Sequence, residues 1–379
     1  MAIELSNLTF TNWADVVPPF GVEEILINIG VANTLAGNDI ITGITITPYN
    51  YAVFNSGTLN TAEGDDAITG IGGSVGIYNT GTFNTAEGND IITTDAGGQS
   101  GIYNAGTFNT GKGNDIINAK TGFGVGLDNY GTFNTAEGDD IINGRGFFNG
   151  ISLGTGSSFD TEDGNDIIRG NSEKFSNFPT SGIFNSSSTL NTGDGNDIID
   201  GTGYKGIDNG GLINTGNGKD IITGTGSNGN NLDENGTGIY NSGTINTGND
   251  DDIITSTVVN SKGDVIKSAN SIFNSGTIDT GNGNDFIIAE GGFDGMGSVF
   301  LGNGQDYLKG FGSGNFNGGN GKDALELTSG SYTVGRSGTA VNFTKDSIIM
   351  NTSEFEILIA GNTIYNFASL TAGQTIVVV

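Results

Sequence analysis

Hydrophobic and polar residues alternate along this chain in short runs, and glycine interrupts the pattern every few positions. A typical stretch, residues 76–92, reads GIYNTGTFNTAEGNDII, and close copies follow at 101–117 and 238–254. Each copy holds three β-prone runs (GIYN, TFNT and DII) separated by glycine corners. A repeat of about 25 residues with three short strands predicts a parallel β-helix whose coils hydrogen-bond to one another.

Period-two alternation assigns three columns of residues to a triangular core. The second apolar residue after a recurring aspartate is Ile or Leu in every copy, from Ile41 to Leu325. The other two columns are Phe83, Phe108, Phe133, Phe159, Leu190, Ile213, Ile245 and Ile278, and Ile77, Ile102, Leu127, Ile151, Ile183, Ile207, Ile239 and Ile272. The first apolar residue after the aspartate varies more, as Ala67 and Phe286 do. That variation predicts an outward apolar stripe along which the protein could self-associate.

The predicted fold class is therefore all-β, a parallel β-helix or β-solenoid of about twelve coils. Residues 1–31 are expected to form an N-terminal cap, 32–326 the repeats, and 327–379 a C-terminal β cap, because the repeat is missing from both ends. Length varies mainly at the corner after the DII run. The long loops at 171–181, 225–237 and 257–270 should therefore share one edge.

One aspartate recurs in every copy, just before the DII run. The twelve are Asp39, Asp66, Asp90, Asp115, Asp140, Asp166, Asp197, Asp220, Asp252, Asp285, Asp306 and Asp323. Carboxylates stacked ~4.8 Å apart repel by about 1 kcal/mol per pair even in water, and turn acids such as Glu63 and Asp65 are expected to add to this. The column therefore favours a bound cation. The alternative is that each aspartate only caps backbone N–H groups.

Composition narrows the choice of cation. The chain has a formal net charge of -29 and contains neither cysteine nor histidine, so carboxylate and carbonyl oxygens are the ligands it can offer. Such ligands suit a hard ion, and calcium is the first candidate. The same negative charge disfavours nucleic acid as a partner, and no apolar run is long enough to predict a membrane span.

The corner sequences TGNGNDFI at 280–287 and GGNGKDAL at 318–325 resemble the nine-residue repeat of the repeats-in-toxin (RTX), or hemolysin-type, calcium-binding family. The resemblance implies that turn carbonyls and the twelve aspartates share calcium ions between coils, at up to about eleven sites. It also implies an extracellular or cell-surface protein exported by a type I route without a cleaved signal peptide. Only the turns at Asp306 and Asp323 follow each other as closely as in that family, so one metal column is expected here instead of two.

Three functions remain open from the sequence. The first is a structural or binding module whose folding calcium drives and which has no catalytic residues; a glycan could bind its aromatic column, which includes Tyr78 and Tyr103. The second is a calcium-dependent β-helix enzyme acting on a polysaccharide or small molecule at the loop edge, which the lack of histidine disfavours. The third is an ice-binding or adhesin-type solenoid. A threonine ladder that includes Thr107 favours ice binding, whereas turn residues such as Glu63 and Lys112 interrupt a flat array at the corner.

Overall fold

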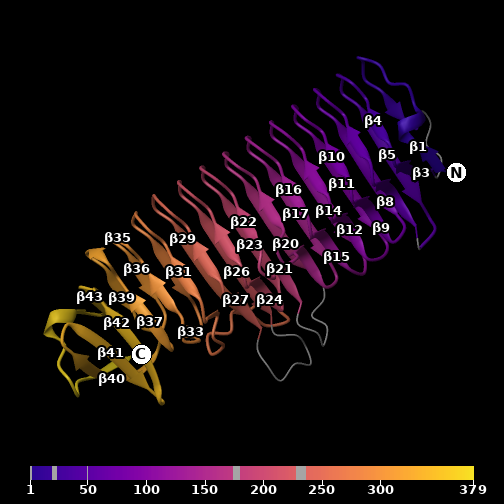
Figure 1. Ribbon diagram of the computed structural model, residues 1–379. Helices are drawn as coiled ribbons and strands as arrows, with labels where there is room; N and C mark the ends of the chain where they lie inside the picture. The colour runs from indigo at the N-terminus through magenta and orange to yellow at the C-terminus, as the bar shows by residue number, and fades with distance from the viewer. Residues whose placement is uncertain (1, 19–23, 49, 174–179, 228–235) are drawn as a thin grey trace.

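The chain winds into a straight stack of coils, each of which supplies one strand to each of three parallel sheets (Figure 1). The computed structural model describes residues 2–18, 24–48, 50–173, 180–227 and 236–379. Within these ranges helical structure is limited to two short 3-10 turns, Leu5–Asn7 and Phe367–Ser369. The predicted fold class, an all-β parallel solenoid, is confirmed.

The three sheets are numbered in the order in which a coil visits them. Sheet 1 holds β1 (Ala2–Glu4), β3 (Ile25–Asn28), β6 (Tyr51–Asn55), β9 (Val75–Asn79), β12 (Ser100–Asn104), β15 (Val125–Asn129), β18 (Asn149–Leu153), β21 (Ser181–Asn185), β24 (Lys205–Asn209), β27 (Thr237–Asn241), β30 (Ile272–Asn274) and β33 (Phe293–Asp294). Sheet 2 holds β4 (Val31–Asn33), β7 (Thr58–Asn60), β10 (Thr82–Asn84), β13 (Thr107–Asn109), β16 (Thr132–Asn134), β19 (Ser158–Asp160), β22 (Thr189–Asn191), β25 (Leu212–Asn214), β28 (Thr244–Asn246), β31 (Thr277–Asp279), β34 (Ser298–Phe300) and β37 (Gly314–Asn317).

Sheet 3 follows the aspartate corner. It holds β2 (Val16–Val17), β5 (Ile40–Thr45), β8 (Ala67–Gly72), β11 (Ile91–Ala96), β14 (Ile116–Thr121), β17 (Ile141–Gly146), β20 (Ile167–Ser172), β23 (Ile198–Gly203), β26 (Ile221–Ser227), β29 (Ile253–Val259), β32 (Phe286–Ala289), β36 (Tyr307–Lys309) and β39 (Ala324–Glu326). A small parallel pair, β35 (Asn303–Gly304) and β38 (Asn320–Gly321), joins two late turns.

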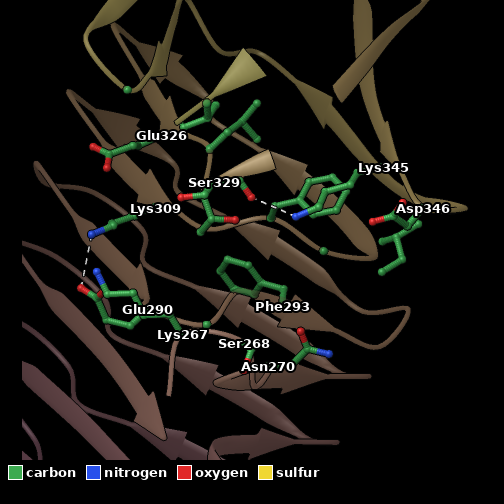
Figure 2. A pocket seen from close by; sticks show the side chains of 18 of the residues that line it. Lys267, Ser268, Asn270, Glu290, Phe293, Lys309, Glu326, Ser329, Lys345 and Asp346 are labelled. Atoms are coloured by element: carbon green, nitrogen blue, oxygen red, sulfur yellow. Dashed lines mark hydrogen bonds and ion pairs between the residues drawn. The ribbon is translucent and has the colours of Figure 1, made fainter. Parts of the chain in front are cut away.

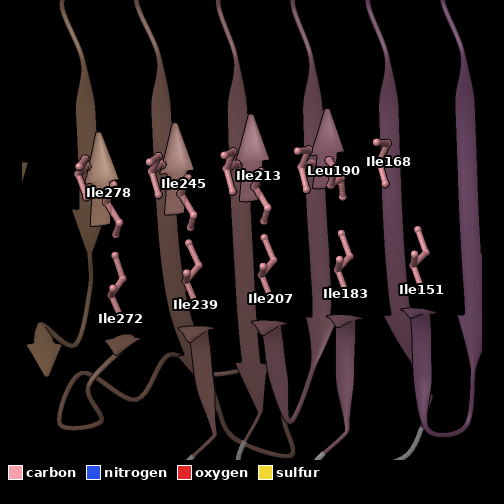
Figure 3. Packing of buried hydrophobic residues seen from close by; sticks show 14 of the residues in the cluster. Ile151, Ile168, Ile183, Leu190, Ile207, Ile213, Ile239, Ile245, Ile272 and Ile278 are labelled. Carbon is pink, nitrogen blue, oxygen red and sulfur yellow. The ribbon is translucent and has the colours of Figure 1, made fainter. Parts of the chain in front are cut away.

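The register between coils places equivalent residues directly over one another. Thr82, Phe83 and Asn84 pair with Thr107, Phe108 and Asn109 of the next coil. All three predicted core columns are buried, and Figure 3 shows their side chains converging from the three sheets. The rings of Phe83, Phe108, Phe133 and Phe159 stack face to face, with centroids 4.5 to 4.8 Å apart. The core is thus a set of columns of apolar side chains in contact along the rod.

A buried asparagine column closes the corner between sheets 1 and 2. The Asn79 side-chain amide donates to Asn104 Oδ1 at 2.8 Å, and Asn104 donates in the same way to Asn129 at 2.8 Å. Leu153 replaces asparagine in the following coil, and there the Asn129 amide donates to the Ser158 carbonyl at 2.9 Å. These amides hold adjacent coils together in the interior, where unpaired polar groups would be costly.

The two ends differ in how they continue the sheets. Residues of the expected N-terminal cap supply β1, β2 and β3, each paired in parallel with a strand of the following coil. At the other end, β42 (Ile348–Ser353), β41 (Ala340–Lys345), β40 (Gly330–Ser337) and β45 (Thr375–Val378) extend sheet 2, while β43 (Ile357–Ala360) and β44 (Thr363–Asn366) extend sheet 3. Most of these late pairings are antiparallel. The cap boundaries drawn from the sequence stay a prediction.

The three long loops all connect sheet 3 to sheet 1, as the sequence predicts. They follow β20, β26 and β29 respectively. Residues 174–179 and 228–235 of the first two loops lie outside the described residues.

Replacement of Phe108 by alanine should lower the free energy of unfolding by about 3–5 kcal/mol, because it leaves a cavity between two stacked rings. Replacement of Ile116 by alanine, on the outward side of β14, should cost no more than about 1 kcal/mol. Chemical denaturation followed by circular dichroism measures both. Equal losses for the two variants would contradict the assignment of inward and outward columns.

Candidate functional site: the aspartate column

The corner between sheets 2 and 3 is a turn that keeps one backbone conformation from coil to coil. Its second residue has a positive φ whether or not it is glycine, as at Ala86 (69°), Gly111 (87°) and Glu162 (58°). The fourth residue is more demanding: a Cβ at Gly88 would lie 1.9 Å from the Gly64 carbonyl oxygen. Glycine is therefore favoured there by the close approach of the previous coil, with φ of 151° at Gly64 and 158° at Gly88. Asp250, which replaces this glycine in one coil, has a φ of 80°.

The turn delivers every one of the twelve aspartates into the interior of the corner. None exposes more than 2% of its surface. One carboxylate oxygen, Oδ1, accepts a hydrogen bond from the backbone N–H of the aspartate one coil earlier, at 2.7 Å for Asp66 and 2.8 Å for Asp115 and Asp140. The last aspartate, Asp323, donates its own N–H to Glu356 Oε2 of the C-terminal segment at 2.8 Å. The N–H capping weighed from the sequence is therefore real, but it uses only half of each carboxylate.

The other carboxylate oxygen, Oδ2, has no hydrogen-bond partner in eleven of the twelve aspartates, although it is buried. The exception is Asp197, whose Oδ2 accepts from the Thr192 hydroxyl at 2.5 Å. Thr85 instead donates to the Thr110 carbonyl at 2.9 Å. In the described part of the chain the hydroxyls of Thr110 and Thr135 have no partner at normal hydrogen-bond distance, and they lower the pKa of Asp115 and Asp140 by less than burial raises it. The result is a row of buried oxygens with unused acceptor capacity, which is a costly arrangement unless a proton or a cation satisfies it.

Burial raises the pKa of these carboxyl groups, although a nearby threonine and the backbone amide act against it. The pKa of Asp90 rises to about 7 and that of Asp140 to about 8, with desolvation as the main cause. The neighbouring aspartates in the column add a smaller increase. Burial disfavours the charged carboxylate. Near neutral pH the aspartates of the folded corner therefore take up protons, or their ionisation is unfavourable.

A second ladder, which the sequence analysis missed, runs along the outside of the same turn. The side-chain oxygen of Asp65 accepts from the Asn89 backbone N–H at 2.9 Å, and Asn89 Oδ1 accepts from the Asn114 N–H at 2.9 Å. These hydrogen bonds lower the pKa of Asp65 and also that of Asp139. Both acids therefore stay charged, and Asp65 raises the pKa of Asp66 while Asp139 raises that of Asp166, as expected of turn acids that add to the repulsion. The signal was the recurrence of Asn or Asp immediately before nine of the twelve column aspartates.

Neighbouring carboxylates of the aspartate column can act together as a pair of metal ligands. Among the described residues, no three Asp or Glu side chains converge closely enough to hold a metal ion by themselves. An ion between coils would therefore be held by column carboxylates together with turn carbonyl oxygens, which are ligands that calcium accepts. The twelve predicted site residues are thus brought into one column, and their role as metal ligands stays a prediction.

The outward side of sheet 2 carries two further ladders. Thr58, Thr82, Thr107 and Thr132 form one, and Asn60, Asn84, Asn109 and Asn134 form the other; together with Val31 and Asn33 they line a shallow groove of about 520 Å³. The asparagines are tied along the row, with Asn84 donating to Asn60 at 2.6 Å and Asn109 to Asn84 at 2.7 Å. This side of the rod is a regular array of hydroxyl, methyl and amide groups.

The other two outward faces carry apolar side chains. On sheet 1, the rings of Phe54, Tyr78 and Tyr103 stack on one another with centroids 4.8 to 5.6 Å apart, so their faces cover each other. On sheet 3 the apolar stripe is exposed, with Ile91 at 47% and Phe286 at 41%. Its outward orientation agrees with the sequence analysis, and self-association through it stays a prediction.

Comparison with known proteins gives one informative likeness. No protein-family model matches the chain, and no curated protein matches it. Among solved structures, the chain resembles a hyperactive, Ca²⁺-dependent, β-helical antifreeze protein from an Antarctic bacterium, with a TM-score of 0.51 and 15% sequence identity. The likeness covers 96% of this chain and 93% of that one. At this identity it shows a shared β-helical fold. In the described ranges, the structure contains no helix with the length and apolar character to cross a bilayer.

The pKa shifts predict that the ion-free protein is most stable near pH 4. A carboxyl group whose pKa is raised in the folded state contributes stability below its unfolded pKa of about 3.9 and loses it as pH rises through the folded value. For Asp115 and Asp252 those folded values are about 6 and about 8. Outer acids such as Asp65, with a lowered pKa, lose their contribution as pH falls below about 4.

The melting temperature, measured by circular dichroism on metal-stripped protein, should therefore fall steadily from pH 5 to pH 8. A melting temperature that is constant or rises over this interval would contradict the burial of ionisable groups in the column.

Proposed function

We propose that this protein is a calcium-binding β-solenoid, a structural and binding module whose folding calcium drives. The observation that carries the proposal is the row of buried, partnerless Oδ2 atoms in the aspartate column. A hard cation placed between coils would satisfy these oxygens and offset the repulsion between stacked carboxylates. The fold that this chain shares with a Ca²⁺-dependent protein supports the choice of ion. The resemblance of the turns to RTX repeats supports it further.

The same column explains why calcium would drive folding. Without an ion, each added coil brings another carboxylate into a buried, like-charged row, so stacking and ionisation oppose each other near neutral pH. A ligand that binds only the stacked state shifts the equilibrium toward it. The calcium-free chain at pH 8 is expected to be loosely folded and to gain β structure when calcium is added.

Substitution of Asp140 by asparagine gives a test with opposite signs in two conditions. The amide removes a buried charge, so in chelator at pH 8 the variant should be more stable than the parent by about 1–3 kcal/mol. In millimolar calcium it should be less stable and should bind fewer ions, because a charged ligand has been lost. Thermal melts by circular dichroism and ion counting by mass spectrometry measure both effects.

Asp139, which is exposed in the same turn, provides the matched control. Its substitution by asparagine should leave the calcium stoichiometry unchanged, since Asn can accept the same hydrogen bond from Asn165. If the parent's β spectrum is identical in chelator and in calcium, or if the Asp140 variant shifts in the same direction in both conditions, the proposal fails.

A calcium requirement of this kind fits a protein outside the cell or on its surface, where calcium reaches millimolar levels and weak sites are filled. We extend the proposal to that location, and to export by a type I route, on the strength of the RTX-like turns. Fractionation of cells that express the tagged chain would place it. Accumulation in the cytoplasm alone would contradict this part of the proposal.

Ice binding is a second candidate, which the threonine and asparagine ladders of sheet 2 favour. The sequence analysis identified the threonine row but looked for a flat array at the corner; the regular array lies on the sheet face, with Thr107 exposed and the asparagine row beside it. Rows of hydroxyl and methyl groups repeating at the strand spacing can hold water in ordered positions. The structural neighbour is described as an antifreeze protein.

Replacement of Thr107 by tyrosine should reduce thermal hysteresis several-fold, because a bulky ring would interrupt the row. Replacement of Thr93 by tyrosine, on the outward side of β11, should leave the activity unchanged. The two substitutions are chemically identical and both introduce a residue that β-strands favour. Absence of thermal hysteresis in the calcium-loaded parent, or equal loss in both variants, would rule out this face as an ice-binding surface.

A further inference from the structure

A cavity of about 520 Å³ lies where the solenoid meets its C-terminal cap (Figure 2). It forms because sheet 1 ends at β33, whereas sheets 2 and 3 continue for further coils. The space that the next strand of sheet 1 would occupy is bordered by the loop 257–270, by the corners at 290–293 and 309–312, and by the hairpin turn after β41. Several segments distant in the sequence therefore contribute to one pocket, at the corner between sheets 3 and 1 where the long loops lie.

The pocket groups lysines beside an equal number of acidic side chains, in a protein where lysine and arginine are scarce. The chain has 13 Lys and Arg residues in total, and three of them, Lys267, Lys309 and Lys345, line this one cavity. Because the net charge of -29 repels anions from most of the surface, a local group of lysines is what an anionic ligand would need in order to bind.

The ammonium groups keep donors available for a ligand. Lys345 Nζ donates to the Ser329 carbonyl at 2.9 Å, and Lys309 Nζ pairs with Glu290 Oε1 at 3.3 Å. Each ammonium has three donors, so these two lysines retain capacity. Lys267 is exposed, and in the described part of the chain no carboxylate lies within ion-pair distance of it.

Carboxylates line the same pocket and narrow the class of ligand. Glu290 pairs with Lys309, and Glu326 accepts a hydrogen bond from the Tyr307 hydroxyl at 2.5 Å. Asp346 is a third acid in the lining, and all three carboxylates keep lone pairs that can accept from hydroxyl groups. A compact dianion would be repelled by these acids, and a neutral sugar would leave the lysines unused. A ligand that carries one carboxylate and several hydroxyls matches both sets of groups.

We propose that this pocket binds a hexuronate, either as a free sugar acid or as the end of an acidic polysaccharide. The sugar carboxylate pairs with Lys267 and the neighbouring lysines, and the sugar hydroxyls donate to Glu290 and Glu326. Buried Phe293 and Phe311 form part of the wall and exclude water from one side. This inference goes beyond the proposed calcium and ice functions and is independent of both, since it concerns different residues at the opposite corner.

Calorimetric titration of the folded protein with galacturonate and with galactose tests the proposal, because the two sugars differ only at C6. Galacturonate should bind with a dissociation constant of about 1 mM, as expected for a ligand of this size, and galactose at least about tenfold more weakly. Added salt should weaken galacturonate binding. The titration is made under conditions that give a β-rich circular dichroism spectrum, so a failure of calcium to drive folding is read separately.

Two lysines of the same loop provide a matched pair of variants. Substitution of Lys267 by glutamine should weaken galacturonate binding about tenfold. The same substitution at Lys262, which is exposed but outside the pocket, should leave the binding unchanged. A tighter affinity for an oligogalacturonide than for the monomer would identify the end of an acidic polysaccharide as the ligand. Equal affinities would identify the free sugar acid as the ligand. Equal binding of galacturonate and galactose, no saturable galacturonate binding, or equal loss in both lysine variants would overturn the proposal.

Discussion

Parallel stacking in strict register is the constraint on which the rest of this molecule depends. Each coil lies over the previous one with equivalent residues paired, so most inward side chains meet an identical or similar residue. For phenylalanine and isoleucine this contact buries apolar surface, and for asparagine it forms a chain of amide hydrogen bonds. For aspartate it brings like charges together out of contact with water, and among the residues that the structure describes no lysine or arginine forms an ion pair with the column.

The turn reduces the repulsion between the column aspartates without removing it. Its outer residues, such as Asp65 and Asn89, accept backbone N–H groups from the next coil, and its inner aspartates accept from the coil before. These bonds fix the backbone of the turn and favour the charged state of the outer acids. On the inner side these hydrogen bonds satisfy Oδ1 of each aspartate and leave Oδ2 without a partner in eleven of the twelve. The atoms that can bind a proton or an ion therefore lie along one line. Glu356 supplies the acceptor for the last turn of the row.

Much of the fold could be predicted from the sequence because its information is local and repeated. Period-two alternation was enough to find Ile77, Phe83 and Ile92 as core residues, and the turn pattern was enough to align the twelve aspartates. What could not be predicted depends on contacts between coils. The division of each carboxylate into a bonded and an unbonded oxygen depends on where the neighbouring turn places its N–H, and no spacing in the sequence encodes that.

The pocket at the end of sheet 1 could not be predicted from the sequence for a different reason. Lys267, Lys309 and Lys345 belong to a loop, a shortened corner and a cap hairpin, and no motif connects them. They come together only because one of three sheets ends before the others. Sequence reasoning pointed to the variable corner as the place for recognition, but it could not show that the cavity lies at the seam with the cap.

The opposite directions of the two turn ladders have a consequence for how such a chain can change in length. Most internal coils present acceptors to both of their neighbours and receive donors from both, so one coil-to-coil junction resembles the next. A coil could be duplicated or removed by unequal recombination without leaving mismatched surfaces, while the two termini stay as they are. The length of such a rod can therefore change while its cross-section is held constant.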